Sequence, residues 1–237
     1  FKTILTEGVD RLLQWRSPLY AYKNYSKDIN LLLKYYQLSD DIAFRFSNRD
    51  WPEYPLTVDK FVNWIDHLTL SEDKGRNQFL NLFMDYETFG EHQWAESGIF
   101  DFMAHFPAEV LKRANLGFAT PRETTELANY QQESISFPEA VSWADEQRDL
   151  SAWLENDMQH NAIETLYELF EKVKVKGDES LLKTTRMLST SDHFYYMCAK
   201  YFQDGDVHKY FSPYDSPDQA YIYYINALAE LEERLLR

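Results

Sequence analysis

The 237-residue chain has a single cysteine, only seven glycines and fewer basic than acidic residues. One cysteine excludes an internal disulfide and any metal site built from several thiolates. The glycines are scattered singly, so no glycine-rich loop is present to bind a phosphate. No apolar run approaches the roughly 20 residues that span a membrane, and no signal peptide is recognisable. We therefore expect a cytoplasmic protein without a membrane partner.

Charge and aromatic content narrow the possible partners. The chain carries 24 Lys and Arg against 39 Asp and Glu, a formal net charge of −15. Such a surface repels phosphate backbones, so a nucleic-acid partner is not expected, whereas a neutral polymer is compatible. Simple solubility explains the acidity equally well. Aromatic residues make up 16% of the chain. They permit a sugar-binding cleft, although core packing accounts for most of them.

Motifs for other chemistries are missing. The six histidines show no His-x-x-x-His or comparable ligand spacing, and we expect neither a metal site nor a cofactor. No Gly-x-Ser-x-Gly nucleophile elbow is present.

Up to about residue 130 the chain alternates strand-like and helix-like segments. The expected strands cover residues 2–6, 29–34, 78–84 and 116–120. Expected helices begin after the N-cap residues Ser39 and Thr57, and a third covers about 100–113. Strand, helix and strand at these lengths predict an α/β fold with a parallel sheet.

From about Pro138 onward no strand is expected. Apolar residues recur from Leu150 to Val173 and predict one long amphipathic helix that ends at Gly177. A second helix is expected over residues 180–202. Ser216 and Pro217 are typical of the N-cap and first turn of a last helix. We expect residues 131–237 to form an α-helical bundle domain.

One segment stands out as a candidate site. The apolar run 80–84 ends in Asp85-Tyr86-Glu87-Thr88-Phe89-Gly90-Glu91-His92. In barrel enzymes, catalytic residues follow the C-terminal ends of buried parallel strands. An ordinary acidic turn after a strand explains the spacing equally well. If strand geometry continued, Glu87 would point to the same side as Asp85, so spacing does not separate the two carboxylates.

Asp85-Tyr86-Glu87-Thr88-Phe89-Gly90 resembles the Asp-x-Glu-x-Phe-Gly segment of glycoside hydrolase family 57, the retaining α-glucanases. Other segments resemble the α-amylase branch of that family, in the same order: residues 1–11, 38–46, 142–145, 148–154 and 190–193. The resemblance implies that residues 1–130 are the C-terminal part of an incomplete (β/α)7 catalytic barrel. The family's nucleophilic glutamate precedes the part that matches Phe1. We therefore expect a C-terminal fragment, inactive without the missing N-terminal half.

By the same resemblance, Asp85 is the general acid/base of a double displacement on α-1,4-glucans such as starch, glycogen or maltodextrins. That role requires a raised pKa, so that Asp85 is protonated when the bond breaks. Partial desolvation at the end of an apolar strand and the charge of the nucleophile would both raise the pKa. Glu7, which ends the first expected strand, is interpreted as lying behind the catalytic residues.

The remaining expected site residues bind the glucan: Glu87, His92, Trp94, Trp143, Asp145, Asp192 and Tyr195. Glu87 would orient its neighbours. His92 would donate to a sugar hydroxyl beside the stacking face of Trp94, or else be an ordinary turn histidine. Asp192 matches the family's last motif, although an N-cap aspartate followed by core aromatics is the alternative. Trp143 and Asp145 are expected at the start of the long helix.

Other functions stay open. A 4-α-glucanotransferase or a branching enzyme of the same family would share the glycosyl-enzyme intermediate, and a sugar instead of water would intercept it. A non-catalytic glucan-binding module is a third possibility for these residues alone, since only one carboxylate of the catalytic pair is assigned.

Overall fold

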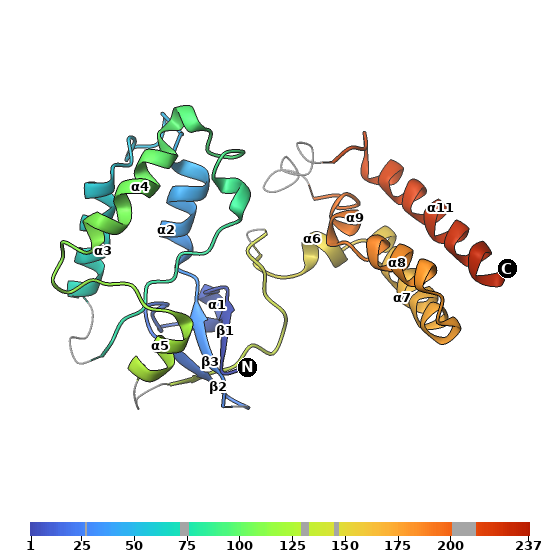
Figure 1. The fold of residues 1–237 in the computed structure, drawn as a ribbon, viewed down its shortest axis with the longest axis horizontal. Helices are drawn as coiled ribbons and strands as arrows, with labels where there is room; N and C mark the ends of the chain where they lie inside the picture. The colour runs from blue at the N-terminus through green and yellow to red at the C-terminus, as the bar shows by residue number, and fades with distance from the viewer. Residues whose placement is uncertain (27, 72–75, 129–132, 145–146, 201–211) are drawn as a thin grey trace. The chain divides into compact units, whose positions relative to one another are not determined.

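The computed structural model describes residues 1–26, 28–71, 76–128, 133–144, 147–200 and 212–237 (Figure 1). The chain forms two compact units, Phe1–Pro138 and Glu139–Arg237. Strands and helices share the first unit, whereas the described elements of the second unit are helices. The protein therefore has an α/β fold. Among the described residues, no helix is long and apolar enough to cross a membrane.

A mixed sheet of four short strands lies in the first unit. The strands are β1 (Thr3–Thr6), β2 (Tyr22–Asn24), β3 (Asn30–Leu33) and β4 (Ser134–Ile135), in the order β1-β3-β2-β4. β1 runs parallel to β3, with Thr3 opposite Asn30 and Thr6 opposite Leu33. β2 runs antiparallel to β3 and parallel to β4. The expectation of a parallel sheet is thus met for two of the three pairings, and it fails for β2 with β3, because the short link between them allows only an antiparallel return.

Two of the expected strands, 78–84 and 116–120, do not form. The segment 78–84 pairs with the end of β3 through only one parallel bridge, between Lys34 and Asn81. Its other hydrogen bonds go elsewhere: the Phe79 N–H donates to Leu19 O and the Phe83 N–H to Ser39 Oγ. Residues 116–120 are mostly exposed and lead into a helix, so they have no buried face to pair.

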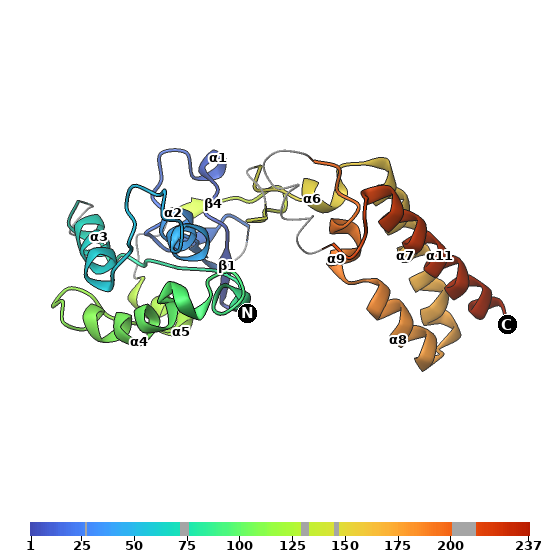
Figure 2. The ribbon, with the colours of Figure 1, turned by 90° about the horizontal axis from the view of Figure 1, so that it is seen from above.

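The helices of the first unit are α1 (Asp10–Leu13), α2 (Tyr36–Asp40), the π-helical turn η1 (Asp41–Arg45), α3 (Val58–Ser71), α4 (Ile99–Val110) and α5 (Pro121–Leu127). α3 and α4 pack against each other, as Figures 1 and 2 both show. Thr57 caps α3 through its hydroxyl, as predicted, at 3.3 Å from the Lys60 N–H. Ser39 is not an N-cap. It lies inside α2, and its Oγ donates to Tyr35 O.

The second unit contains α6 (Ser151–Leu154), α7 (Asp157–Lys176), α8 (Glu179–Leu188), α9 (Ser191–Tyr195) and α11 (Pro217–Leu236). α7, α8 and α11 pack around one apolar core. The predicted single helix from 150 to 173 is interrupted, because Asn156 and Gln159 form a capping box that starts α7 afresh. Gly177 ends α7 with φ 69°, as predicted.

Of the next two helix predictions, the first is met in part and the second is confirmed. The helix expected over 180–202 ends at Leu188, α9 follows as a separate turn, and residues 201–202 lie outside the described part. Ser216 caps α11 as predicted, with its Oγ 3.1 Å from the Gln219 N–H. Cys198 is buried.

Gly8 lies where β1 leaves the sheet, and it contacts the backbone at the end of β3. A Cβ at Gly8 would lie 2.4 Å from Lys34 O, whereas nothing lies within 4 Å of a Cβ at Gly117. We expect Gly8→Ala to lower the free energy of unfolding by about 1–3 kcal/mol, because backbone must shift to make room. Gly117→Ala should cost less than about 0.5 kcal/mol. Urea unfolding of both variants measures this, and equal losses would contradict it.

Candidate active site

A buried cluster of charges marks the C-terminal end of the two parallel strands. Glu7 follows β1 and Lys34 follows β3. The Lys34 ammonium lies 3.8 Å from Glu7 Oε2 and 3.5 Å from Asp40 Oδ1 on α2. The side chains of Lys34 and Glu7 are 4% and 2% exposed. The two carboxylates offset the cost of burying the ammonium, and the cluster fixes how β1, β3 and α2 meet at this edge.

Asp85 reaches the same edge of the sheet. The Tyr35 N–H donates to Asn81 O at 2.8 Å, and the Asn81 amide donates to Leu33 O at 3.0 Å. These bonds hold the segment that precedes Asp85 alongside the end of β3. Asp85 itself then begins the 3-10 turn η2 (Tyr86–Thr88). Strand geometry therefore ends at Asp85, and the argument that Glu87 points to the same side does not apply.

The loop that carries Asp85 is closed on itself and anchored to η1. The Gln93 N–H donates to Thr88 O at 2.9 Å, and the Gly90 N–H donates to Gln93 O at 3.0 Å. Gly90 has φ 118°, a conformation that other residues rarely adopt. The buried Gln93 amide donates to Ala43 O at 2.9 Å. Asp85 is thus presented by a fixed loop, which a positioned catalytic group requires.

The environment of Asp85 raises its pKa. Asp85 is exposed, so its carboxyl is accessible to a substrate. The protein that surrounds one side of the carboxyl removes part of its hydration, and this desolvation is the largest cause of the raised pKa. The negative charge of Glu87 acts in the same direction, and His92 and Lys34 act against it. A raised pKa favours the protonated carboxyl that a general acid needs near neutral pH.

The charge of Glu87 gives a pH prediction. Because this charge favours the protonated form of Asp85, Glu87→Gln should lower the pKa of Asp85. The general acid is active when protonated, so the basic limb of kcat/KM should move to lower pH. Glu91→Gln is the matched control, since Glu91 does not contribute to the Asp85 pKa. A basic limb that stays in place, or moves to higher pH, in Glu87→Gln would contradict the assignment.

Other expected site residues lie in the same loop. The backbone N–H of His92 donates to Glu87 O at 3.0 Å, and His92 is half-buried. Glu87 is exposed, and the Trp94 residue is 66% exposed. The structure thus brings together Asp85, Glu87, His92 and Trp94. An exposed indole offers a flat surface on which a sugar ring can pack.

The remaining expected residues belong to the second unit. Asp192 lies in the first turn of α9 and is exposed. The Tyr195 ring lies 5.7 Å, centroid to centroid, from the Trp153 ring. Trp143 is 44% exposed, but it precedes α6, so the expectation that it starts a helix is wrong. The backbone N–H of Ala144 bonds to Ser142 Oγ, and this turn replaces the helix. Asp145 lies outside the described residues.

Two residues of this edge, Lys34 and Asp40, were missed by the sequence interpretation. The available signal was a lysine directly after the buried run Leu31–Leu33, since a charge at the end of a core strand needs a partner. Within the described ranges, no group of three or more His, Cys, Asp or Glu side chains is arranged to hold a metal ion.

Comparison with known proteins identifies the family. The sequence profile described as Glycosyl hydrolase family 57 matches residues 1–138, more than half of the chain. The chain therefore belongs to glycosyl hydrolase family 57. The matched stretch contains both the Lys34 cluster and the Asp85 loop.

Similar proteins agree with this membership. A protein of Methanocaldococcus jannaschii named "Putative alpha-amylase" is 41% identical over 241 residues, covering 98% of this chain and 50% of its own length. The chain thus spans about half of that curated relative. A family 57 branching enzyme of Thermococcus kodakaraensis, solved with glucose and additives, has a similar fold (TM-score 0.61, 14% identity, 99% of this chain and 56% of that one). So does a family 57 branching enzyme of Pyrococcus horikoshii (TM-score 0.61, 13% identity, 99% and 55%).

Proposed function

We propose that this chain carries the acid/base part of a retaining, α-amylase-like enzyme that hydrolyses α-1,4-glucans such as starch, glycogen or maltodextrins. The observation that supports it best is Asp85: an accessible carboxyl with a raised pKa, on an anchored loop, inside the stretch that matches the family. On this proposal residues 1–130 complete a (β/α)7 barrel with strands from elsewhere in a longer protein. The expected helical domain, residues 131–237, would then begin after β4, at the second compact unit Glu139–Arg237.

The proposed reaction has two steps. A glutamate outside these 237 residues attacks the anomeric carbon, while Asp85 donates its proton to the leaving glycosidic oxygen. Asp85 then takes a proton from the water that cleaves the glycosyl-enzyme intermediate. The carboxylates of such a pair stand about 5–5.5 Å apart. No cofactor is needed.

Glucan contacts are proposed for each unit by itself. Trp94 would stack on a sugar ring, His92 would bond a hydroxyl, and Glu87 would set the pKa of Asp85. In the second unit, Trp143, Asp145, Asp192 and Tyr195 would bind further sugars. A carboxylate such as Asp192 has enough acceptor capacity for two hydroxyls at once.

A transferase is the second candidate, because the two solved structures of similar fold are titled branching enzymes. The intermediate would be the same, and a sugar hydroxyl would replace water. Incubation of the complete protein with maltopentaose separates the two: a hydrolase yields only shorter chains, whereas a transferase yields longer or branched ones. Dominant longer products would overturn the amylase assignment and leave the role of Asp85 intact.

The 237-residue chain alone should release no reducing sugar from maltooligosaccharides, because its proposed chemistry lacks a nucleophile. The complete protein, assayed in parallel at equal concentration, should be active. Turnover by the purified chain would contradict the proposal and would place the nucleophile among its own carboxylates. If the complete protein bound glucan without turnover, the family member would be a binding module.

A further inference from the structure

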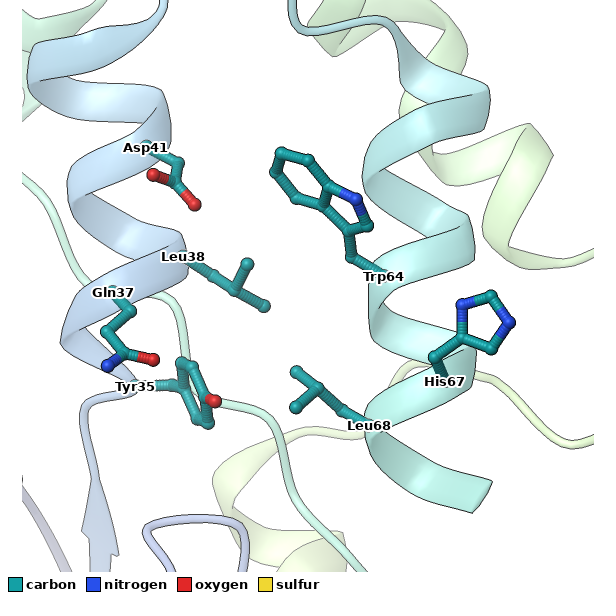
Figure 3. Close-up of a pocket in the computed structure, with 7 residues that line it drawn as sticks. All are labelled: Tyr35, Gln37, Leu38, Asp41, Trp64, His67 and Leu68. Atoms are coloured by element: carbon teal, nitrogen blue, oxygen red, sulfur yellow. The ribbon is translucent and has the colours of Figure 1, made fainter. Parts of the chain in front are cut away.

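A pocket of about 440 Å³ opens between α2 with η1 on one side and α3 on the other. The pocket is open to solvent and not enclosed, and its volume lies within the range of small-molecule sites. Its lining residues are Tyr35, Gln37, Leu38, Asp41, Trp64, His67 and Leu68. Figure 3 shows Trp64 and Leu68 reaching from α3 toward Leu38 and Asp41 on the facing helix.

The lining combines ring surface with hydrogen-bonding groups. Trp64 and Tyr35 supply aromatic rings, and Asp41 supplies a carboxylate on the side that faces Trp64, whereas Gln37 and His67 are exposed polar residues of the lining. A pyranose needs both, since its C–H face packs on a ring and its hydroxyls bond to carboxylates and amides. No lysine or arginine is among the lining residues. Two nearby cations are already paired, Arg45 with Asp41 and Lys60 with Glu53, so the pocket suits a neutral ligand better than a phosphate or a carboxylate.

The two walls are tied together before any ligand binds. The Arg45 Nε donates to Asp41 Oδ1 at 2.6 Å, and Arg45 Nη2 donates to Gln37 O at 3.0 Å. The same guanidinium lies 5.9 Å from the centroid of the Trp51 ring, which packs edge-on at 6.1 Å against Trp64. This chain of contacts holds Asp41 and Trp64 in place, which lowers the entropy lost on binding.

The pocket and the charged edge use different faces of α2. Tyr36 and Asp40, one helical turn apart, contact Asp10 at 3.2 Å and Lys34 at 3.5 Å respectively. Gln37 and Asp41 are also one turn apart and line the pocket. Successive residues of a helix point about 100° apart, so the two pairs lie on different faces, and neither Lys34 nor Asp85 is among the lining residues of the pocket.

We propose that this pocket is a second carbohydrate site, which holds a glucose unit of an α-glucan apart from Asp85. For its ligand class the inference rests on the proposed function. A polymer bound at two points has a higher effective concentration at the catalytic loop. Pocket variants should therefore lose activity on glycogen and keep it on short maltooligosaccharides.

The test labels the 237-residue chain with 5-fluorotryptophan and titrates maltoheptaose by fluorine NMR. The chain has six tryptophans, and Trp64→Phe assigns the pocket signal. We expect a saturable shift of the Trp64 signal that persists in Asp85→Asn and is not produced by cellohexaose. The double variant Gln37→Ala with Asp41→Ala should weaken binding at least tenfold. His67→Ala, at an exposed position, should weaken it too, and exposed His105→Ala should not.

The outcomes separate the two proposals. A Trp64 signal that does not move, or that moves equally with cellohexaose, would overturn the pocket whether or not Trp94 responds. A Trp64 shift that the pocket variants abolish would support the pocket. If full hydrolysis by Asp85→Asn accompanied that shift, the catalytic assignment would fail and the pocket would stand. Dispersed signals from the other tryptophans show whether each variant is folded. If the double variant is unfolded, the effect of the single variant His67→Ala on maltoheptaose binding decides the test.

Discussion

Asp85→Asn in the complete protein should reduce kcat/KM for maltooligosaccharides by about 10²–10⁴-fold, the contribution of a positioned general acid/base. The amide has nearly the same shape as the carboxyl, but it cannot give a proton to the leaving oxygen or take one from water. The loop should keep its fold, since its anchors are Gln93, Thr88 and Gly90 and not the Asp85 side chain. Initial rates and a thermal melt measure both effects.

Two controls make the result specific. Glu91→Gln removes a neighbouring exposed carboxylate of the same loop and should change the rate little. Glu87→Gln should cost less than Asp85→Asn at the optimal pH, because Glu87 acts through the pKa of Asp85. A rate near wild type in Asp85→Asn, or a larger loss in Glu87→Gln, would mean that Asp85 is not the acid/base.

Lys34→Met should lower the free energy of unfolding of the first unit by about 3–5 kcal/mol, since it removes the cation from a buried cluster of charges. Glu7 and Asp40 lie 3.8 and 3.5 Å from the ammonium, and the Glu7 side chain is 2% exposed. The edge of the sheet should loosen because Glu7, which follows β1, and Asp40 on α2 lose their shared cation, although the backbone bridge between residue 34 and Asn81 does not depend on the side chain. Urea unfolding followed by hydrogen exchange at β1 and β3 would measure this.

Lys112→Met is the matched control for this variant. Its ammonium bonds to Glu109 on the surface of the same unit, and the Lys112 side chain is 70% exposed. Solvent screens such a pair, so the urea midpoint should stay unchanged within error. Equal midpoints for Lys34→Met and wild type would show that the buried cluster does not stabilise the edge.

Local signals in the sequence predicted local structure well. Thr57 and Ser216 cap α3 and α11, and Gly177 ends α7, because each depends only on hydrogen bonds or dihedrals within one turn. Ser39 failed as a cap for the opposite reason. Its Oγ accepts from Phe83, 44 residues away, so its role depends on the packing of a distant segment.

The sheet and the candidate site also divide into features set by local sequence, which were predicted, and features set by contacts between distant segments, which were not. β1 and β3 each contain consecutive apolar residues and were predicted, whereas β2 and β4 are two or three residues long and exist only through their pairing. Asp85 was predicted through its motif. The partners of Lys34 come from strand pairing, and the pocket of Asp41 and Trp64 comes from the packing of two helices. The pattern of apolar and polar residues in the sequence predicts neither the Lys34 cluster nor the pocket.

The most direct test of Asp85 as acid/base is chemical rescue. The complete protein with Asp85→Ala, given an aryl maltoside whose leaving group needs no protonation, should form the glycosyl-enzyme and then stall, because no base activates water. Azide needs no base, so it should restore turnover and give the α-configured glycosyl azide by retention. No acceleration by azide, or a β-configured product, would contradict the account.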